Sequence, residues 1–284
     1  MIQQLTIFGV GLIGGSLALA LKKAGYCKQV VGCSRSAEHL QRAVDLGVID
    51  RYTLDPAEAV KGADMIFLAV PMGAMQAVFE SIVDHIEDYA VITDAGSAKG
   101  SVITAVKAAF GTIPTHFVPG HPIAGLEKSS VEAALADLYI DHKVILTPLE
   151  STNVDAIQRV REMWQVTGAE VESLEVEQHD AVLAATSHLP HILAFSFVNS
   201  LSESPQSDKI FHYVAGGFKD FSRIASSDPV MWRDICLENK QAILEALNDY
   251  QQNLSNLANL IRDEKGEALL EEFVHAKTER DKHI

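Results

Sequence analysis

Three loops in the first half of the chain carry side chains that can do chemistry. Each follows an apolar run: Val70-Pro71-Met72, then Asp94-Ala-Gly-Ser97-Ala-Lys99-Gly, then Gly120-His121-Pro122. An imidazole exchanges a proton near neutral pH, and a histidine between glycine and proline in a loop is not an ordinary core residue. Loops of this kind carry sites more often than packing residues. We therefore expect the chemical site here, with His121 and Ser97 as candidates.

A second group of imidazoles lies further along, where His179, His188 and His191 fall within thirteen residues. Zinc sites on helices typically use an i, i+4 histidine pair with a nearby glutamate, which this run lacks, so we expect no metal. His188 and His191 are three residues apart and could share a helix face, although Pro190 is expected to interrupt that helix. A hydrogen-bonded core imidazole is the alternative, above all for His188.

Arg223 lies among Phe218, Phe221 and Ile224. An arginine in apolar surroundings normally has an anionic partner, so this run favours an anion site. Placement of Arg223 on the solvated surface is the alternative.

The glycines of Gly9-Val-Gly-Leu-Ile-Gly14 follow the first apolar run and open a helical stretch. Gly9 permits a tight turn, Gly11 lets a pyrophosphate approach the backbone, and Gly14 lets helix and strand pack closely. The N-terminus of the helix then faces the phosphates. A glycine-rich packing turn is the alternative, but the strand–turn–helix context favours a dinucleotide site.

The end of the second apolar run bears on the choice of cofactor. An acidic residue there binds the ribose 2′-hydroxyl of NAD, but this chain has Ser34 and Arg35, and its first carboxylate is Glu38. A hydroxyl and a guanidinium suit a 2′-phosphate, so NADP is favoured over NAD, with a merely solvated Arg35 as the alternative. The residues expected to contact the cofactor are Gly9, Gly11, Leu12, Ile13, Gly14, Ser34, Arg35, Val70 and Pro71.

The elements that must position these loops are strands alternating with helices. The apolar runs are continuous rather than alternating, which is typical of strands covered on both faces of a parallel sheet. They occupy Leu5–Phe8, Gln29–Cys33, Met65–Val70, Ala90–Thr93, His116–Val118 and Lys143–Thr147. We predict an α/β fold: a Rossmann-type doubly wound parallel sheet over residues 1–174, followed by an all-helical dimerisation domain over residues 175–284.

The helical half contains an a/d pattern of three heptads. It is formed by Ile243, Leu247, Tyr250, Leu254, Leu257 and Ile261. Such a seam needs a partner helix, which either the same chain or a second copy can provide. The domain is small and has little interior of its own, and both interpretations remain open.

Composition limits the partners. Lys and Arg number 23 and Asp and Glu 38, which gives a net charge of −15 and disfavours nucleic acid and anionic membrane surfaces. Cys27, Cys33 and Cys236 lack metal-ligand spacing and are odd in number, as in a reduced, cytoplasmic chain. The uncharged stretch Ile7–Leu21 contains four glycines and no Lys or Arg precedes it, so we interpret it as a buried strand and helix rather than a signal or membrane segment.

Six motifs, in order across the chain, resemble the prephenate/arogenate (cyclohexadienyl) dehydrogenase family of tyrosine biosynthesis. They are Gly9-Val-Gly-Leu-Ile-Gly14-Gly-Ser16, Asp94-Ala-Gly-Ser97-Ala-Lys-Gly100, His121-Pro-Ile-Ala-Gly125, Ser187-His-Leu-Pro-His191, Gly217-Phe-Lys-Asp-Phe-Ser-Arg223 and Asp228-Pro-Val-Met-Trp232. Only the first is shared by many dehydrogenases. The resemblance implies a homodimer with interlocked helical domains, and we expect no fused mutase or regulatory domain in 284 residues.

The resemblance also implies oxidative decarboxylation of a cyclohexadienyl dianion, with hydride transfer from C4 to NAD(P) and loss of carbon dioxide from C1. His121 is then the base for the C4 hydroxyl proton, and Ser97 hydrogen-bonds that hydroxyl or His121. Arg223 is the carboxylate clamp, and Lys99 and Lys219 add local positive charge. The other residues expected around the substrate are His179, His191, Glu127 and Trp232, the last from the partner chain.

Prephenate has a keto group where arogenate has an amino group, and Leu126 and Glu127 at the pocket edge leave the preference open. A different hydroxyacid dehydrogenase of Rossmann-plus-helical architecture usually needs a catalytic lysine in the helical domain and gives no reason for His121-Pro122. A non-catalytic NADP-binding sensor would keep the fold without turnover. Fold alone does not separate these functions.

Overall fold

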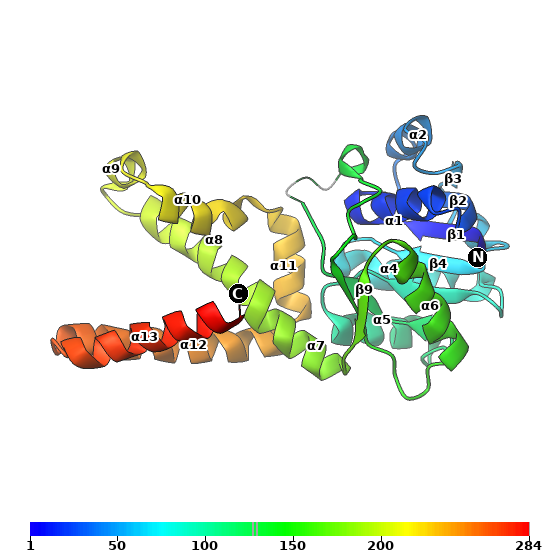
Figure 1. Cartoon of the computed structure of the whole chain (residues 1–284). Helices are drawn as coiled ribbons and strands as arrows, with labels where there is room; N and C mark the ends of the chain where they lie inside the picture. The colour runs from blue at the N-terminus through cyan, green and yellow to red at the C-terminus, as the bar shows by residue number, and fades with distance from the viewer. Residues whose placement is uncertain (127, 129, 284) are drawn as a thin grey trace.

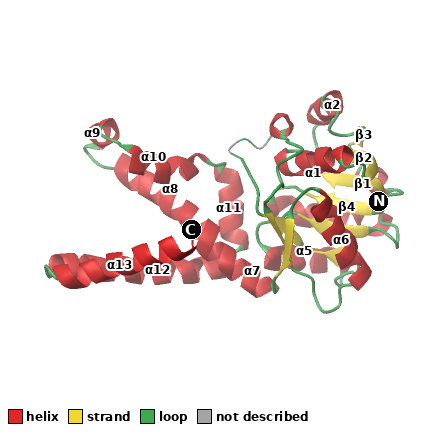
Figure 2. Cartoon of the chain, viewed as in Figure 1, coloured by secondary structure: helices red, strands yellow, loops and turns green. Residues whose placement is uncertain are grey.

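The computed structural model describes residues 1–126, 128 and 130–283. A compact part built around a β-sheet holds the N-terminal half, and an elongated array of helices holds the rest (Figure 1). Figure 2 shows that the strands are confined to the first part. The predicted fold class, a parallel-sheet domain followed by a helical one, is confirmed.

The main sheet has six parallel strands in the order β3-β2-β1-β4-β5-β6. Their bounds are Ile2–Phe8 (β1), Cys27–Cys33 (β2), Arg51–Thr53 (β3), Met65–Leu68 (β4), Val91–Asp94 (β5) and Phe117–Val118 (β6). The intervening helices are Leu12–Lys23 (α1), Ala37–Asp45 (α2), Pro56–Val60 (α3), Met75–Ile82 (α4) and Lys99–Phe110 (α5). This is the doubly wound order, in which ligands bind where the connections reverse, here beyond the carboxyl ends of β1 and β4.

A second sheet corrects one expectation. Lys143–Thr147, expected in the parallel sheet, forms β8 (Lys143–Leu146) between β7 (Gly120–Pro122) and β9 (Glu170–Ser173). β8 is antiparallel to β7 and parallel to β9. Pro119, which has no amide hydrogen, ends the main ladder directly after β6, and the chain then enters the second sheet. His121 therefore lies on a strand.

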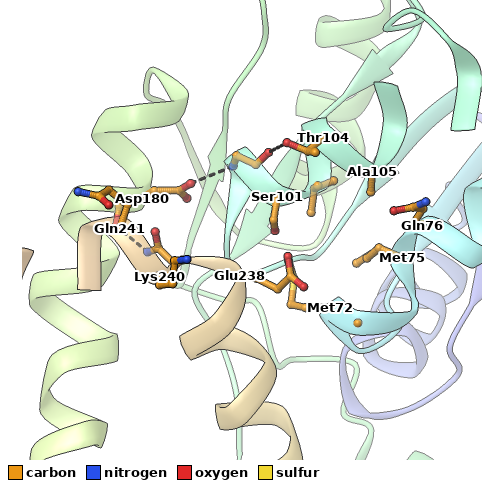
Figure 3. A pocket seen from close by; sticks show the side chains of 14 residues that line it. Met72, Met75, Gln76, Ser101, Thr104, Ala105, Asp180, Glu238, Lys240 and Gln241 are labelled. Carbon is orange, nitrogen blue, oxygen red and sulfur yellow. Dashed lines mark hydrogen bonds between the residues drawn. The ribbon is translucent and has the colours of Figure 1, made fainter. Parts of the chain in front are cut away.

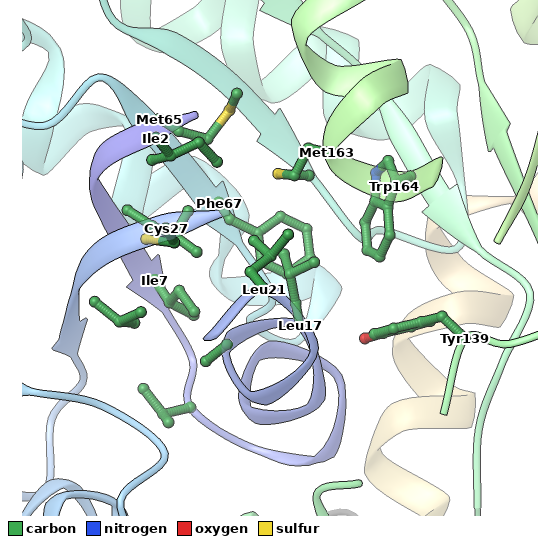
Figure 4. Close-up of a cluster of buried hydrophobic side chains, with 14 of the residues drawn as sticks. Ile2, Ile7, Leu17, Leu21, Cys27, Met65, Phe67, Tyr139, Met163 and Trp164 are labelled. Carbon is green, nitrogen blue, oxygen red and sulfur yellow. The ribbon is translucent and has the colours of Figure 1, made fainter. Parts of the chain in front are cut away.

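Aromatic side chains hold in place α1, the helix that follows the glycine fingerprint Gly9–Gly14. Trp164, on α6 (Val154–Val166), packs edge-on against Phe67 and Tyr139, with ring centroids 5.6 and 5.0 Å apart (Figure 4). The Tyr139 hydroxyl donates to the carbonyl of Ile13, at 2.6 Å, in the first turn of α1. Packing of the core around Tyr139 thus fixes the position of the first turn of α1, next to the glycine loop.

The helical part begins with one continuous helix. It comprises α7 (Val176–Leu183), a π turn (Ala184–His188) and α8 (Leu189–Ser202). The interruption expected at Pro190 does not occur within described residues 176–202. The wide turn directly precedes Pro190, and such a π turn lets the helix continue past a residue that has no amide hydrogen. By length and composition alone this helix could cross a membrane, and 22% of that window is buried.

The remaining helices fold back around it. They are α9 (Ser207–His212), α10 (Gly216–Ser222), a short turn (Arg223–Ser226), α11 (Pro229–Glu238), α12 (Lys240–Arg262) and α13 (Gly266–His283). The a/d seam lies on α12 and is only partly covered within this chain. Ile243 is buried, whereas Leu254 is 48% and Ile261 63% exposed. The distal seam therefore leaves apolar surface uncovered.

Candidate active site

The glycine fingerprint adopts the geometry that a dinucleotide requires. Gly9 has a φ of +89°, and a Cβ there would lie 2.4 Å from the carbonyl oxygen of Ala69. A Cβ on Gly14 would lie 2.2 Å from the carbonyl oxygen of Gly9, so only glycine lets α1 pack this closely on β1. Gly11 caps α1 without a side-chain hydrogen bond, which leaves the positive end of the helix facing the cleft.

The other expected cofactor residues surround the same edge. Leu12 is buried and Ile13 half-buried at the start of α1, and Val70 and Pro71 follow β4. Ser34 and Arg35 lie between β2 and α2. The exposed Arg35 and the half-buried Ser34 thus lie beyond the end of β2, where a doubly wound sheet receives the adenosine ribose.

His121 is the centre of the chemical site. Its Nδ1 lies 2.9 Å from Nε2 of His179, and Nδ1 of His179 lies 2.8 Å from a carboxylate oxygen of Asp180. His179 and Asp180 lie on α7, so this chain of hydrogen bonds joins the two parts of the molecule. Nε2 of His121 makes no hydrogen bond to any described residue and is the nitrogen available to a substrate.

Burial sets the protonation state of His121. Desolvation holds the pKa of His121 well below its usual value, and repulsion from His179 and His188 in their protonated forms and from Lys99 lowers it further. Burial likewise lowers the pKa of His179, against the opposing effect of its hydrogen bond to Asp180. Both rings are therefore neutral at pH 7, and a neutral ring is the form that can accept a proton.

A buried ion pair fixes the backbone of Gly120, the residue directly before His121 in the sequence. Lys99 and Asp94 are both fully buried, with Nζ 2.5 Å from Oδ2. Lys99 also donates to the carbonyl of Gly120, and Asp94 accepts from the amide of Gly120. Lys99 was expected to offer positive charge to the substrate, but the structure uses it inside the protein, because an unpaired buried carboxylate would be costly.

Ser97 lies half-buried in the loop between β5 and α5. The expected hydrogen bond from Ser97 to His121 is not formed among the described residues, where the partner of His121 is His179, at Nδ1. The other expected role of Ser97, a hydrogen bond to the substrate hydroxyl, stays a prediction.

The remaining candidates cluster around Trp232. The rings of Trp232 and His191 stack, with centroids 3.8 Å apart. The pKa of His191 is lowered chiefly by burial, and the positive charge of Arg223 lowers it further. Trp232 is 7% exposed within its own chain, and its expected entry into the site of a partner subunit stays a prediction. Glu127 lies outside the described residues.

His188 is the core imidazole that the sequence suggested as an alternative. It is buried, its Nδ1 lies 3.1 Å from the side-chain nitrogen of Asn239, and burial lowers its pKa to about 4. His188 and His191 do share a face, since both rings contact Trp232. No cluster of three or more His, Cys, Asp or Glu able to hold a metal occurs among the described residues.

Sequence reasoning missed Asp180 and Asn239. Both line a cavity of about 490 Å³ between α4, α5 and the start of α12 (Figure 3). The position of Asp180 directly after His179 was the available signal, but only the fold shows which imidazole it bonds.

Two family models match this chain. The nucleotide-binding domain of prephenate dehydrogenase matches residues 17–173, and the dimerization domain of prephenate dehydrogenase matches residues 175–275. The chain belongs to the prephenate dehydrogenase family. The resemblance inferred from the six motifs is thereby confirmed.

Individual members of the prephenate dehydrogenase family agree. The chain is 38% identical to a cyclohexadienyl dehydrogenase of Zymomonas mobilis, over 98% of this chain and 95% of that protein. It is 36% identical to the prephenate dehydrogenase of Bacillus subtilis, over 98% of this chain and 76% of that protein. The A. aeolicus prephenate dehydrogenase, solved with hydroxyphenyl propionate and NAD+, superposes with a TM-score of 0.92 at 38% identity, covering 99% and 98% of the two chains. Synechocystis arogenate dehydrogenase gives 0.84 at 25% identity, covering 99% and 100%.

We expect His121→Asn to lower kcat by about 10² to 10⁴ fold, the usual contribution of a general base. In the parent enzyme, kcat/KM should stay high as the pH falls through 6.5 and decline only at the depressed pKa of His121, because the base is lost once it is protonated. Steady-state kinetics against pH measure both effects. The exposed His85 offers a control, since His85→Asn should match the parent. A flat acid limb would remove His121 from the role of base.

Proposed function

We infer that the chain is an NAD(P)-dependent prephenate/arogenate (cyclohexadienyl) dehydrogenase of tyrosine biosynthesis, and we propose that His121 is its base. Family membership supports the reaction class. One observation supports the base: a buried, neutral imidazole beside the dinucleotide edge has one nitrogen held by His179 and the other available.

The residues at the sheet edge fit the cofactor. The fingerprint leaves no room for a Cβ at Gly9 or Gly14, and α1 presents uncapped amides. The backbone of Gly9–Gly14 would hold the pyrophosphate, Val70 and Pro71 would flank the cofactor, and Ser34 and Arg35 would hold the ribose end. When bound, the nicotinamide supplies the acceptor for the hydrogen that leaves C4 with its electron pair.

The remaining changes fall to the substrate and to His121. Nε2 of His121 takes the C4 hydroxyl proton as C4 becomes a carbonyl carbon. The bond from C1 to its carboxylate then breaks, and its electron pair makes the ring aromatic. The phenolate oxygen regains the proton from His121, so the base is restored without net proton release. Aromatisation provides the driving force, and the protein mainly positions the reactants.

Arg223 is the carboxylate clamp in this proposal. Its charge lowers the pKa of His191, and the ring of His191 stacks on Trp232, so the guanidinium lies in the same region as these two rings. Local charge must hold a dianion, because the net charge of −15 opposes its approach. With Lys99 buried, Arg223 and the exposed Lys219 supply that charge, and Glu127 stays a predicted pocket residue.

We propose that the enzyme accepts prephenate, arogenate or both, and that turnover is the deciding test. Purified protein should raise the reduced-cofactor absorbance with at least one of these substrates, each assayed with NADP and with NAD. A simple 2-hydroxy acid serves as control and should give no rate. No turnover in any combination, together with measurable cofactor binding, would favour the non-catalytic sensor instead.

NADP is the proposed cofactor. The relative from A. aeolicus was solved with NAD+, so nucleotide binding is common to the fold and the choice between the two rests on this chain. Ser34 and Arg35 support a 2′-phosphate, since the loop before α2 contains no carboxylate.

Ser34→Asp should move the preference toward NAD. A carboxylate at this position accepts hydrogen bonds from a ribose 2′-hydroxyl and repels a 2′-phosphate. We expect the NADP/NAD ratio of kcat/KM to fall at least about tenfold, and Arg35→Ala to lower the NADP value while sparing that for NAD. A ratio that stays at the parent value in Ser34→Asp would contradict the assignment.

We propose a homodimer formed through the helical part. The dimerization-domain match and the exposed apolar residues of α12 and α13 support it. The partner subunit, rather than a membrane, would then cover the apolar helix Val176–Ser202.

We propose that the protein is cytoplasmic. The free thiols of Cys27, Cys33 and Cys236 support this location.

Leu254→Glu combined with Ile261→Glu should convert the dimer to monomer, because association would have to bury two carboxylates on the seam. Light scattering coupled to size-exclusion chromatography measures the mass. The matched control, Gln252→Glu with Asn256→Glu, adds the same charge to the exposed side of α12 and should stay dimeric. Equal masses for the two double variants would place the interface elsewhere.

A further inference from the structure

The carboxylate of Asp180 accepts three hydrogen bonds at the junction of the two parts. This carboxylate, labelled in Figure 3, accepts hydrogen bonds from the backbone amides of Lys99 and Gly100, at 2.8 and 2.9 Å, in the first turn of α5. It also accepts from Nδ1 of His179, at 2.8 Å. Ala98, at the N-cap position directly before α5, has no side-chain acceptor, so a carboxylate from the helical part caps a helix of the nucleotide-binding part.

These contacts keep Asp180 ionised. Partial burial raises its pKa, but the hydrogen bonds from His179 and from the amides of Gly100 and Lys99 outweigh that effect, and the pKa is lowered. An ionised carboxylate only accepts hydrogen bonds. Nδ1 of His179 must therefore carry a hydrogen.

The direction of the next hydrogen bond follows. A neutral imidazole has one donor and one acceptor nitrogen. Because Nδ1 of His179 donates to Asp180, its Nε2 accepts, and the group 2.9 Å away, Nδ1 of His121, must donate. The neutral ring of His121 then carries its lone pair on Nε2.

We propose that Asp180 is a positioning residue that acts through His179 to hold His121 in the tautomer whose Nε2 lone pair is available to the ring hydroxyl. This inference rests on the proposed role of His121 as the base. When Nε2 of His121 takes the proton, the hydrogen on its Nδ1 is already bonded to Nε2 of His179. The negative charge of Asp180 lies on the other side of the His179 ring. The same arrangement persists until the proton returns to the product oxygen.

No other described carboxylate bonds either ring. The charged and titratable groups that act on the pair are Lys99 on α5, Asp94 on β5 and His188 in the π turn. Asp94 is held by Lys99 and by the amides of Gly96 and Gly120. Lys99 and His188 carry no negative charge, so neither can replace Asp180 as the acceptor that sets the two tautomers.

Asn239 fixes the backbone that carries this acceptor. Its side-chain amide donates to the carbonyl of Asp180, at 2.9 Å, and lies beside Nδ1 of His188. Asn239 begins α12, so Asp180 is held from the helical part while it caps α5 of the other part.

The tautomers can be observed directly by ¹⁵N NMR of the histidine rings in the full-length resting enzyme, without substrate. We expect His121 and His179 each to carry the hydrogen on Nδ1. A His121 with its hydrogen on Nε2 in the parent enzyme would overturn the proposal. Because this readout needs no turnover, it stays separate from a failure of the enzyme to oxidise prephenate or arogenate.

Asp180→Asn tests the consequence for the reaction. The isosteric amide can donate as well as accept, so it no longer forces Nδ1 of His179 to carry the hydrogen. We therefore expect His121 to gain the Nε2-hydrogen form, and kcat to fall by about 10² to 10⁴ fold, as when an orienting carboxylate is lost from a catalytic triad. KM for substrate and cofactor should change less than about threefold, since neither binds Asp180 in this account. The control is Glu177→Gln, which removes one exposed carboxylate from the same helix and should leave kcat unchanged.

Cofactor affinity and thermal unfolding of Asp180→Asn show whether the lost cap of α5 has altered the fold. A folded Asp180→Asn enzyme with kcat within threefold of Glu177→Gln would overturn the proposal. If Asp180→Asn does not fold, the NMR measurement on the parent enzyme still decides it.

Discussion

The hydrogen bond between Nδ1 of His121 and Nε2 of His179 is the contact on which this site depends. It joins a strand of the nucleotide-binding part to the first helix of the dimerisation part, so His121, the proposed base, keeps this hydrogen bond only when the two parts are packed together. Both rings are buried, and desolvation keeps them neutral. A neutral base beside the dinucleotide edge is what removal of a hydroxyl proton requires.

Buried charge around that contact fixes its geometry instead of binding substrate. Lys99 and Asp94 together hold both backbone groups of Gly120, directly before His121. Their mutual pairing offsets the cost of removing two charges from water, which neither would tolerate alone. In the proposed mechanism the carboxylates of the substrate are left to exposed cations, Arg223 above all.

Much of the fold could be predicted because local sequence dictates it. Continuous apolar runs predict strands buried on both faces, and Gly9 and Gly14 stand where a Cβ would collide with backbone. The second sheet was missed because β7 has three residues and its pairing with β8 depends on partners distant in sequence. Likewise, the π turn before Pro190, the stacking of Trp232 on His191 and the choice of Asp180 as acceptor follow from tertiary contacts that spacing does not encode.

A crystal structure of the ternary complex with NADP and hydroxyphenyl propionate would test the central claim most directly. The distance to measure joins Nε2 of His121 to the hydroxyl oxygen on the ring. The account predicts about 2.6–3.2 Å, with His179 still bonded to Nδ1. A ring hydroxyl beyond the reach of His121 and bonded to another side chain in its place would contradict it.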